Sequence, residues 1–528
     1  MNKDISKNQI IEGQTALGIE FGSTRIKAVL IDKEHNILAT GYFLWENKLD
    51  NGIWTYSLND AIIGLQKCYQ EIKDTIFRKY GIKLKVIGSI GISAMMHGYL
   101  VLDKDDNLLV PFRTWRNNIA KVAADELTSL FNYKIAARWS IAHLYHAIKN
   151  KEQHVKNIAY QTALEGYIHY LLTGEKVIGI GEASGMFRID LNTKNYNQDM
   201  VCQFESLEAV KTSGLKINKI FPKALVAGEE AGKLTQKGAK IIDPSGDLQP
   251  GIPFCPPEGD AGTGMVSTNS VKPRTGNISA GTSIFGMIIL EKELSKTYSE
   301  IDLVTTPSGE LSAMAHCNNC SSEINAWMDL FGEIAQIKDK ELLYQKMFSK
   351  SLEGETDCGG VLAYNYVSSE NITGIKKGRP LLVRTPESNF TLANFMRSQL
   401  YAAFATLKIG LDLLIDNEQV KIDKIYAHGG LFKTEQVAQR YLSAAINTPV
   451  TVMKTANEGG AWGMAILAMY LLRKKDNQSL ENYLENEVFG KVESVTLEPD
   501  LDDVRGFNQY IKRFKSGLPI VKKAVELL

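Results

Sequence analysis

The chain has 528 residues, of which 44% are hydrophobic and 23% are charged. That length is too great for one ordinary core, so it predicts two large domains of a globular protein. Sixty basic residues balance sixty acidic ones, which argues against a nucleic-acid partner or a membrane surface as partner.

No uninterrupted apolar run reaches the ~18–20 residues that a membrane span needs. The first residues are polar and lack the apolar core of a signal peptide, so we expect a cytoplasmic protein. Six cysteines are too few for a disulfide framework and fit reduced thiols. Cys317 and Cys320 form a lone Cys-x-x-Cys, and without a second pair we expect structural thiols there rather than a metal or redox site.

The apolar patterns near the start of the chain predict four strands and one helix. In chain order these are strand 16–21, strand 26–32, strand 37–45, helix 57–80 and strand 86–92. The tight turn Gly22-Ser23-Thr24 joins the first two strands. Strands that alternate with helices indicate an α/β domain.

The second half begins with the same device. Its predicted elements are strand 275–280, strand 284–290, helix 392–415 and helix 458–472. The turn Gly281-Thr282-Ser283 joins the two strands, as Gly22-Ser23-Thr24 does in the first half. A strand, a Gly/Ser/Thr turn and a second strand in both halves predict a duplicated fold. The stretch 240–262, rich in Pro and Gly, is the best candidate for a domain boundary.

A single carboxylate, Asp260, stands among small residues in Gly259-Asp260-Ala261-Gly262. Glycines let the backbone approach a ligand closely, an aspartate takes a proton, and the amide N–H groups of a turn bind phosphate oxygens. This pattern suits an enzyme that deprotonates a hydroxyl beside a bound polyphosphate. The alternative is an Asx-turn at Asp260 and ordinary hairpin turns elsewhere.

Motifs in a fixed order resemble those of the FGGY carbohydrate kinases, a branch of the actin-like ATPases. They are Gly18–Lys27, Gly91–Gly98, Tyr167–Gly174, Glu182–Gly185 (similar to the family's D-A-S-G), Gly259-Asp260, His428–Lys433 and Glu458–Ala465. The resemblance covers nearly the whole chain, and each motif alone is a weak signal. It implies an α/β fold of two ribonuclease-H-like (actin-like ATPase) domains, with mixed sheets flanked by helices and a cleft between them. The implied domains span 14–262 and 263–528.

The resemblance implies an ATP-dependent kinase that phosphorylates the terminal hydroxyl of a ketopentose, with ATP and Mg²⁺ as cofactors. Asp260 is the implied catalytic base and a substrate contact, and Glu20 is the implied Mg²⁺ contact, through water. The other implied sugar contacts are Met96, His97 and Trp115. The implied phosphate and adenosine contacts are Gly22, Ser23, Thr24, Gly281, Thr282, Ser283, Gly429 and Gly430. The alternatives are a structural histidine at His97 and a core tryptophan at Trp115.

The chain departs from the family pattern at three places. Glu20 stands where the family has Asp, and Ala261 stands where xylulokinases carry Asn or Gln. Trp115-Arg116-Asn117-Asn118 replaces their W-x-D-x-R. The last two changes fall in the implied sugar pocket, so they leave the substrate open but not the reaction.

Met96-His97-Gly98 is the feature most like xylulokinases, so D-xylulose, giving D-xylulose 5-phosphate, is the first candidate substrate. L-ribulose or another pentulose is the alternative. Rivals from a different class are an actin-like ATPase that works as a chaperone or scaffold, and a catalytically silent sugar sensor. The implied partners are the sugar and ATP, with no nucleic acid and no membrane, and a homodimer is the candidate assembly.

Overall fold

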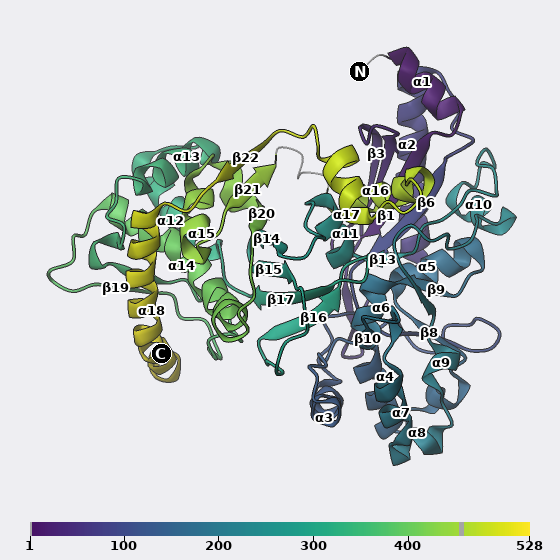
Figure 1. The fold of residues 1–528 in the computed structure, drawn as a ribbon, viewed down its shortest axis with the longest axis horizontal. Helices are drawn as coiled ribbons and strands as arrows, with labels where there is room; N and C mark the ends of the chain where they lie inside the picture. Colours follow the sequence, from purple (N-terminus) through teal and green to yellow (C-terminus); the bar gives the residue numbers. More distant parts are fainter. Residues whose placement is uncertain (1–2, 454–458) are drawn as a thin grey trace. The chain divides into compact units, whose positions relative to one another are not determined.

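The computed structural model describes residues 3–453 and 459–528. They form two compact units. Unit 1 consists of Met1–Val271, Leu303–Leu311 and Asn457–Lys491, and unit 2 consists of Lys272–Asp302, Ser312–Ala456 and Val492–Leu528. The units are therefore discontinuous in sequence, whereas the predicted domains meet at a single cut between 262 and 263. In Figure 1 the yellow-green helices α16 (Gly459–Arg473) and α17 (Leu480–Tyr483) lie among the purple elements of the N-terminal region.

Unit 1 is built on a mixed sheet with strand order β13-β6-β1-β2-β3. Its strands are β13 (Glu258–Gly259), β6 (Ser89–Ala94), β1 (Thr15–Phe21), β2 (Arg25–Asp32) and β3 (Ile37–Leu44). β2 is antiparallel to both β1 and β3, while β1, β6 and β13 run parallel. These strands include those predicted near the start of the chain, with the one predicted at 86–92 shifted to Ser89–Ala94.

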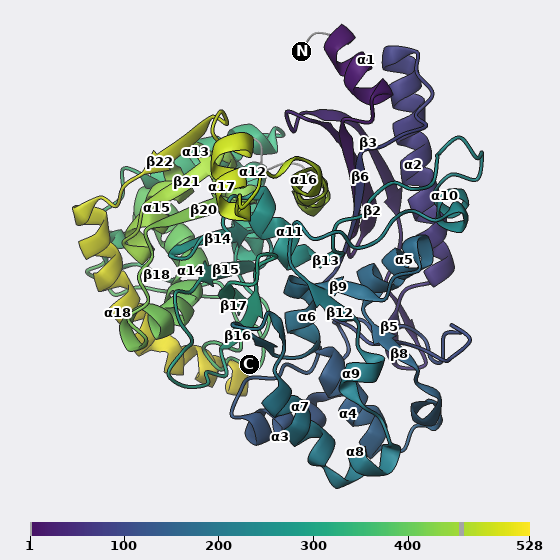
Figure 2. The ribbon, with the colours of Figure 1, turned by 45° about the vertical axis from the view of Figure 1, so that its right-hand side comes forward.

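Helices cover both faces of this sheet. α2 (Leu58–Tyr80) begins at Ser57, whose side chain accepts from Asp60 N, and ends at Gly81 in the left-handed conformation. Figure 2 shows α2 and α16 on opposite sides of the strands. α16 approaches β1 so closely that a Cβ on Gly18 would lie 2.2 Å from the Ala461 carbonyl oxygen. Only glycine fits there, so this part of the β1 sequence is set by its packing against α16.

A second apolar cluster in unit 1 lies among helices rather than on the sheet. It includes the buried faces of α3 (Lys121–Phe131), α4 (Ser140–Lys149), α6 (Ile180–Met186) and α7 (Gln198–Ser206). The remaining elements of unit 1 are α1 (Lys3–Ile11), β4 (Lys48–Asp50), β5 (Ile53–Thr55), β7 (Leu100–Leu102), β8 (Tyr160–Thr162), α5 (Leu164–Thr173), β9 (Val177–Gly179), β10 (Ile189–Asp190), β11 (Asn195–Tyr196), α8 (Glu208–Ser213), α9 (Ile217–Ile220), β12 (Lys223–Leu225), α10 (Gln236–Ile242) and α11 (Asp260–Ser267).

Unit 2 is built on a sheet with strand order β16-β17-β15-β14-β20-β21-β22. Its strands are β16 (Ile301–Thr305, of which Leu303–Thr305 are assigned to unit 1), β17 (Leu311–Cys317), β15 (Ile284–Ile289), β14 (Thr275–Ala280), β20 (Lys424–His428), β21 (Val450–Met453) and β22 (Ser494–Leu497). β15 is antiparallel to both β14 and β17, and β14, β20 and β21 run parallel. The series β17-β15-β14-β20-β21 therefore repeats the pairing of β3-β2-β1-β6-β13, which bears out the duplicated fold.

Helices pack around the sheet of unit 2. They are α12 (Ser322–Ala335), α13 (Lys340–Ser351), α14 (Leu392–Asp412), α15 (Val437–Ile446) and α18 (Leu501–Leu527), beside the short hairpin of β18 (Leu362–Tyr364) and β19 (Leu381–Val383). Buried Asp503 of α18 pairs with Arg397 of α14 and Arg440 of α15. One carboxylate therefore ties three helices together.

One described helical stretch, Leu392–Asn417, is long and apolar enough to cross a membrane by length and composition. Most of its apolar window, 72%, is buried inside the protein. Such burial is what a core helix shows, and a core helix passes the same test of length and composition.

Candidate functional site

Three strands of unit 1 end at the same edge of its sheet. Phe21 of β1 and Gly259 of β13 both lie opposite Ala94 of β6, and all three strands run parallel. Residues that follow the strand ends therefore meet at this edge. Ligands of open α/β sheets bind outside the carboxyl ends of the strands. The edge brings together the first hairpin turn, the segment at Met96 and the carboxylate of Asp260.

Asp260 is the first residue of α11, directly after the strand end at Gly259. Its Oδ1 accepts a hydrogen bond from Met96 N at 3.1 Å. Burial raises the pKa of Asp260, while the N–H groups of Met96 and Ala261 act to lower it. The side chain is only partly exposed, and a carboxylate with a raised pKa is a better proton acceptor than a free one.

The segment after β6 turns sharply at His97 and Gly98, whose φ angles are +74° and +129°. His97 N donates to Glu182 Oε1 at 2.8 Å. The His97 side chain is enclosed, with 4% of the residue exposed, and its ring stacks on Trp139 with centroids 6.5 Å apart. The structure thus joins Met96 directly to Asp260, whereas the His97 ring points into the interior of unit 1.

Trp115 lies in the loop between β7 and α3 and is 39% exposed. The loop is anchored to the end of the Met96–His97 turn, because Tyr99 N donates to Arg113 O at 2.9 Å and Arg113 N donates back at 3.1 Å. Trp115 is therefore two residues from a backbone anchor beside the turn. Its predicted role as a sugar contact stays a prediction.

Glu20 lies on β1 opposite Lys27 of β2. Burial and the nearby charge of Asp260 raise the pKa of Glu20 to about 7, opposed by Lys27 and by the N–H of Ala461. A Cβ on Gly460 would lie 2.3 Å from Glu20 Oε1. The carboxylate therefore meets the first turn of α16, where N–H groups lack helical partners.

The surroundings of Glu20 offer a Mg²⁺ ion one carboxylate rather than a cluster of protein ligands. Among the described residues there is no group of three or more His, Cys, Asp or Glu side chains that could hold a metal ion. Mg²⁺ keeps several waters and takes few protein ligands. Glu20, partly exposed and close to Asp260, is compatible with a contact through water.

The carbonyl oxygens of the first hairpin turn are hydrogen-bonded to two aromatic side chains. Gly22 O accepts from Trp45 Nε1 at 2.7 Å, and Ser23 O accepts from Tyr56 OH at 2.7 Å. The two aromatic rings stack with centroids 4.3 Å apart. Because the carbonyl dipoles are satisfied from behind, the exposed side of the turn offers the N–H and hydroxyl groups of Ser23 and Thr24.

The second hairpin turn, in unit 2, is held in the same way. Gly281 O accepts from Ser321 Oγ at 2.7 Å, and Thr282 O accepts from Cys320 N at 3.0 Å. Cys317 and Cys320 are buried free thiols. Burial raises the pKa of Cys320 to about 12, so this thiol is protonated and its backbone, not its sulfur, supports the turn.

The predicted adenosine residues lie beside this second turn. His428 at the end of β20 pairs with Ser279 of β14. Gly429 follows with φ +112°, and a Cβ there would lie 2.2 Å from Ala280 O. Gly430 faces open space, because a Cβ there would meet no atom within 4 Å. Gly429 and Gly430 thus lie next to Gly281–Ser283, within the same unit.

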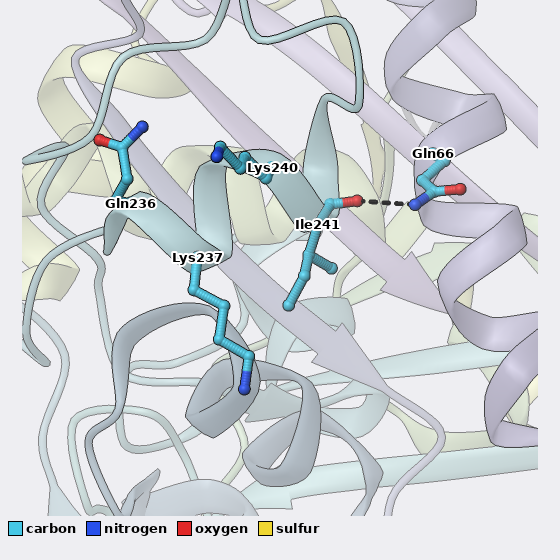
Figure 3. A pocket seen from close by; sticks show the side chains of 5 residues that line it. All are labelled: Gln66, Gln236, Lys237, Lys240 and Ile241. Atoms are coloured by element: carbon cyan, nitrogen blue, oxygen red, sulfur yellow. Dashed lines mark hydrogen bonds between the residues drawn. The ribbon is translucent and has the colours of Figure 1, made fainter.

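A surface hollow elsewhere in unit 1 has a volume of about 530 Å³. It is lined by Gln66 of α2 and by Gln236, Lys237, Lys240 and Ile241 of α10 (Figure 3). Gln66 Nε2 donates to Ile241 O at 3.0 Å. The two lysine side chains point in different directions (Figure 3), so they do not converge on one anion, and no predicted site residue lines the hollow.

Sequence reasoning missed the groups that hold the site in place. Glu182 opens the segment Glu182–Gly185 that resembles the family's D-A-S-G, but nothing in its spacing links it to His97. Trp45, Tyr56 and Ser321 carry no sequence signal, because each acts through a hydrogen bond to a backbone carbonyl of a turn formed elsewhere in the chain.

Two sheets that share a series of five strands with the same pairing, each with a Gly/Ser/Thr hairpin, define the two-domain fold of the actin-like ATPases. Solved structures with this fold include xylulose kinase from Rhodospirillum rubrum, with a TM-score of 0.77, 16% identity and coverage of 96% of this chain and 99% of that one. Gluconate kinase from Lactobacillus acidophilus has a TM-score of 0.76, 17% identity and coverage of 96% and 98%. The predicted fold class is thereby confirmed.

Sequence comparison then identifies the family. The N-terminal domain of the FGGY family of carbohydrate kinases matches residues 15–266, and the C-terminal domain of that family matches residues 276–472. A curated relative, xylulose kinase from Haemophilus influenzae, is 22% identical over 522 residues, covering 95% of this chain and 99% of the relative. The chain belongs to the FGGY family of carbohydrate kinases, and it is an ATP-dependent sugar kinase.

Proposed function

We propose that this kinase phosphorylates the terminal hydroxyl of a ketopentose, with D-xylulose as the first candidate and D-xylulose 5-phosphate as its product. The observation that carries the proposal is the 3.1 Å hydrogen bond from Met96 N to Asp260 Oδ1. It holds the segment that resembles the xylulokinase sugar segment against the proposed base. The name of the Haemophilus influenzae relative supports the same sugar. L-ribulose or another pentulose is the alternative, because Ala261 and Trp115–Asn118 depart from the xylulokinase pattern.

In the proposed reaction Asp260 takes the proton of the sugar hydroxyl. The hydroxyl oxygen forms a bond to the γ-phosphorus as the bond from that phosphorus to the β-phosphate oxygen breaks, which leaves ADP and a sugar phosphate. A positioned base contributes ~10²–10⁴-fold to such a step. Most of the remaining effect comes from positioning and charge stabilisation around a loose transition state.

The two hairpin turns and the glycine pair are proposed to bind the nucleotide. Gly22–Thr24 and Gly281–Ser283 donate N–H and hydroxyl groups to phosphate oxygens, and Gly429-Gly430 forms a flat floor for adenine. Glu20 would hold Mg²⁺ through water. When bound, Mg²⁺ neutralises charge on the β- and γ-phosphate oxygens.

The proposed setting is the cytoplasm, with sugar and ATP as partners and without a nucleic acid or membrane partner. The balance of sixty basic and sixty acidic residues supports this proposal. A homodimer is the proposed assembly, and sedimentation at micromolar concentration tests it.

A coupled ADP-release screen across pentuloses, with hexuloses, polyols and aldonates as comparison substrates, tests the function. We expect D-xylulose to give the highest kcat/KM. Asp260→Asn keeps the shape of the side chain and removes the base, so turnover should fall by at least ~10²-fold while ATP binding persists. Asp32→Asn is the matched control, because Asp32 is a buried carboxylate that accepts N–H bonds at the other end of β2. Near-full turnover in Asp260→Asn would place the base elsewhere.

The same screen separates the rivals. A scaffold ATPase would release ADP without dependence on sugar, and a silent sensor would bind sugar in calorimetry without releasing ADP. Sugar-stimulated ADP release, lost in Asp260→Asn, excludes both.

A further inference from the structure

Glu182 of α6 lies where the Met96–His97 turn meets the strand end that carries Asp260. Two consecutive N–H groups of the turn are each held by a different carboxyl group. Met96 N donates to Asp260 Oδ1 at 3.1 Å, and His97 N donates to Glu182 Oε1 at 2.8 Å. The turn is thus fixed between the proposed base and a second acidic residue to which neither the resemblance nor the spacing gives a role.

The second oxygen of Glu182 faces the base side of the site. Glu182 is 0% exposed, and its Oε2 has no hydrogen-bond partner among the described residues. A Cβ on Gly259 would lie 2.6 Å from this Oε2. One carboxyl group therefore contacts both the backbone of the sugar turn and the residue directly before Asp260.

The helix that carries Glu182 is itself anchored to the same strand. Glu258 Oε1 accepts from Gly181 N at 3.2 Å, and Glu258 Oε2 accepts from Glu182 N at 3.1 Å. At the other end of α6, Gly185 O lies 3.4 Å from His97 Nδ1. A Cβ on Gly185 would come within 2.5 Å of that nitrogen. α6 therefore contacts both the backbone N–H and the imidazole ring of His97.

Burial and three neighbouring carboxyl groups shift the pKa of Glu182. The acidic groups that face it are Glu165, Asp260 and Glu258, and together with burial they raise the pKa of Glu182 well above its ordinary range. Burial and these neighbours favour the protonated form of Glu182, and its Oε1 accepts from His97 N. A glutamine at this position would keep that acceptor and the length of the side chain.

The backbone at His97 needs such support. A residue other than glycine at φ +74° is held in a sparsely populated conformation, which persists only when surrounding contacts enforce it. The buried hydrogen bond to Glu182 is a contact of this kind.

We propose that Glu182 is a positioning residue of the kinase, which holds the Met96–His97 turn at a fixed distance from Asp260 and so sets the place of the sugar hydroxyl. The proposal rests on the proposed function, because it takes the turn as the sugar site and Asp260 as the base. Glu182 acts through the turn and does not itself touch the sugar.

The kinetic test compares Glu182→Gln, Glu182→Asp and Glu182→Ala. Glutamine keeps the acceptor and the length, so kcat/KM for the sugar should stay within about 3-fold of the wild type. Alanine removes the acceptor, and aspartate is one methylene too short to reach His97 N. Each should lower the sugar kcat/KM by about 5- to 100-fold, with ATP KM changed less than about 2-fold. Glu165→Gln is the control, since Glu165 is equally buried and borders Glu182.

A second arm does not depend on activity. Amide hydrogen exchange in a peptide spanning Met96–Tyr99 should be faster in Glu182→Ala and Glu182→Asp than in the wild type, and unchanged in Glu182→Gln and Glu165→Gln. If Glu182→Ala does not fold, Glu182→Asp decides.

Three results would overturn the proposal: a folded Glu182→Asp with wild-type exchange and kinetics, a Glu182→Gln as damaged as Glu182→Asp, or a Glu165→Gln with the same losses. If the wild type phosphorylates no sugar, the proposed function fails, but the exchange arm still decides whether Glu182 holds the turn.

Discussion

Tyr56→Phe tests whether the first hairpin turn binds phosphate through N–H and hydroxyl groups whose orientation depends on the hydrogen bond from Tyr56 to Ser23 O. The substitution removes one hydroxyl and keeps the ring, which is 3% exposed and stacks on Trp45. It leaves Ser23 O without the 2.7 Å hydrogen bond that holds it away from the exposed side of the turn. The turn can then rotate a carbonyl oxygen toward the phosphates, where two negative groups repel each other.

The size of the effect follows from the single bond that is lost. One hydrogen bond of this type contributes ~0.5–1.5 kcal/mol, because its acceptor is satisfied by water when the bond is absent. At ~1.4 kcal/mol for each tenfold change, ATP affinity should fall by about 2- to 13-fold. Sugar affinity should change by less than about 2-fold, because the hydroxyl that is removed donates to Ser23 O of the hairpin.

Steady-state kinetics with ATP varied at saturating sugar, together with calorimetry of ADP binding, measure this effect. Tyr69→Phe is the matched control: Tyr69 is equally buried in unit 1, and its hydroxyl donates to another backbone carbonyl, Leu84 O, at 3.4 Å. We expect Tyr69→Phe to lower stability without changing ATP KM. Equal nucleotide affinity in Tyr56→Phe and the wild type would refute the idea that the Tyr56 hydrogen bond orients this turn to bind phosphate.

Two further predictions concern backbone space and pH. Gly429→Ala should lower the free energy of unfolding by ~1–3 kcal/mol, since a Cβ there would lie 2.2 Å from Ala280 O and the backbone has φ +112°. Thermal denaturation should show no such loss for the control Gly430→Ala, where the space is open. Equal losses in the two variants would contradict this prediction. Burial raises the pKa of Glu258 to about 8 in the folded protein. The unfolded state releases this proton near pH 4.5, so the folded state binds more protons between these values. The free energy of unfolding therefore falls as the pH rises from 4.5 through 8. Glu258→Gln should make urea stability less pH-dependent by up to ~1.4 kcal/mol per pH unit between pH 5 and 8, and an unchanged slope would show that Glu258 is not protonated in the folded state.

The sequence predicted the strands and turns well, because their signals are local. Short, nearly continuous apolar runs mark β1 and β2, and Gly/Ser/Thr marks the turn between them. The repeat of this device predicted the duplicated fold, and the two sheets have the matching strand order. The predicted helix over 392–415 is α14, and that over 458–472 is α16 apart from its first residue, Glu458, which lies outside the described residues.

Contacts between distant segments could not be predicted in this way. The helical spacing of α16 indicates a buried helix but not its partner, and the structure packs it on β1, where Gly18 leaves room for the Ala461 carbonyl. For the same reason a single cut in the sequence cannot describe the two units. Likewise Trp45 and Tyr56 are unremarkable aromatic residues in sequence, and their role depends on the direction of two carbonyl groups.

Glu20, which stands where the family has Asp, and Glu182, which opens the segment similar to the family's D-A-S-G, share a physical consequence. Glu20 and Glu182 each carry one methylene more than aspartate, and each carboxyl group reaches a backbone N–H of another element: Ala461 at the start of α16 for Glu20, and His97 for Glu182. An aspartate would need the neighbouring backbone to move closer to make the same bonds. The longer side chains therefore suit the backbone spacing that this structure shows around Glu20 and Glu182. We therefore expect the spacing of the Met96–His97 turn, together with the side chains at Ala261 and Trp115, to influence which sugar this kinase prefers.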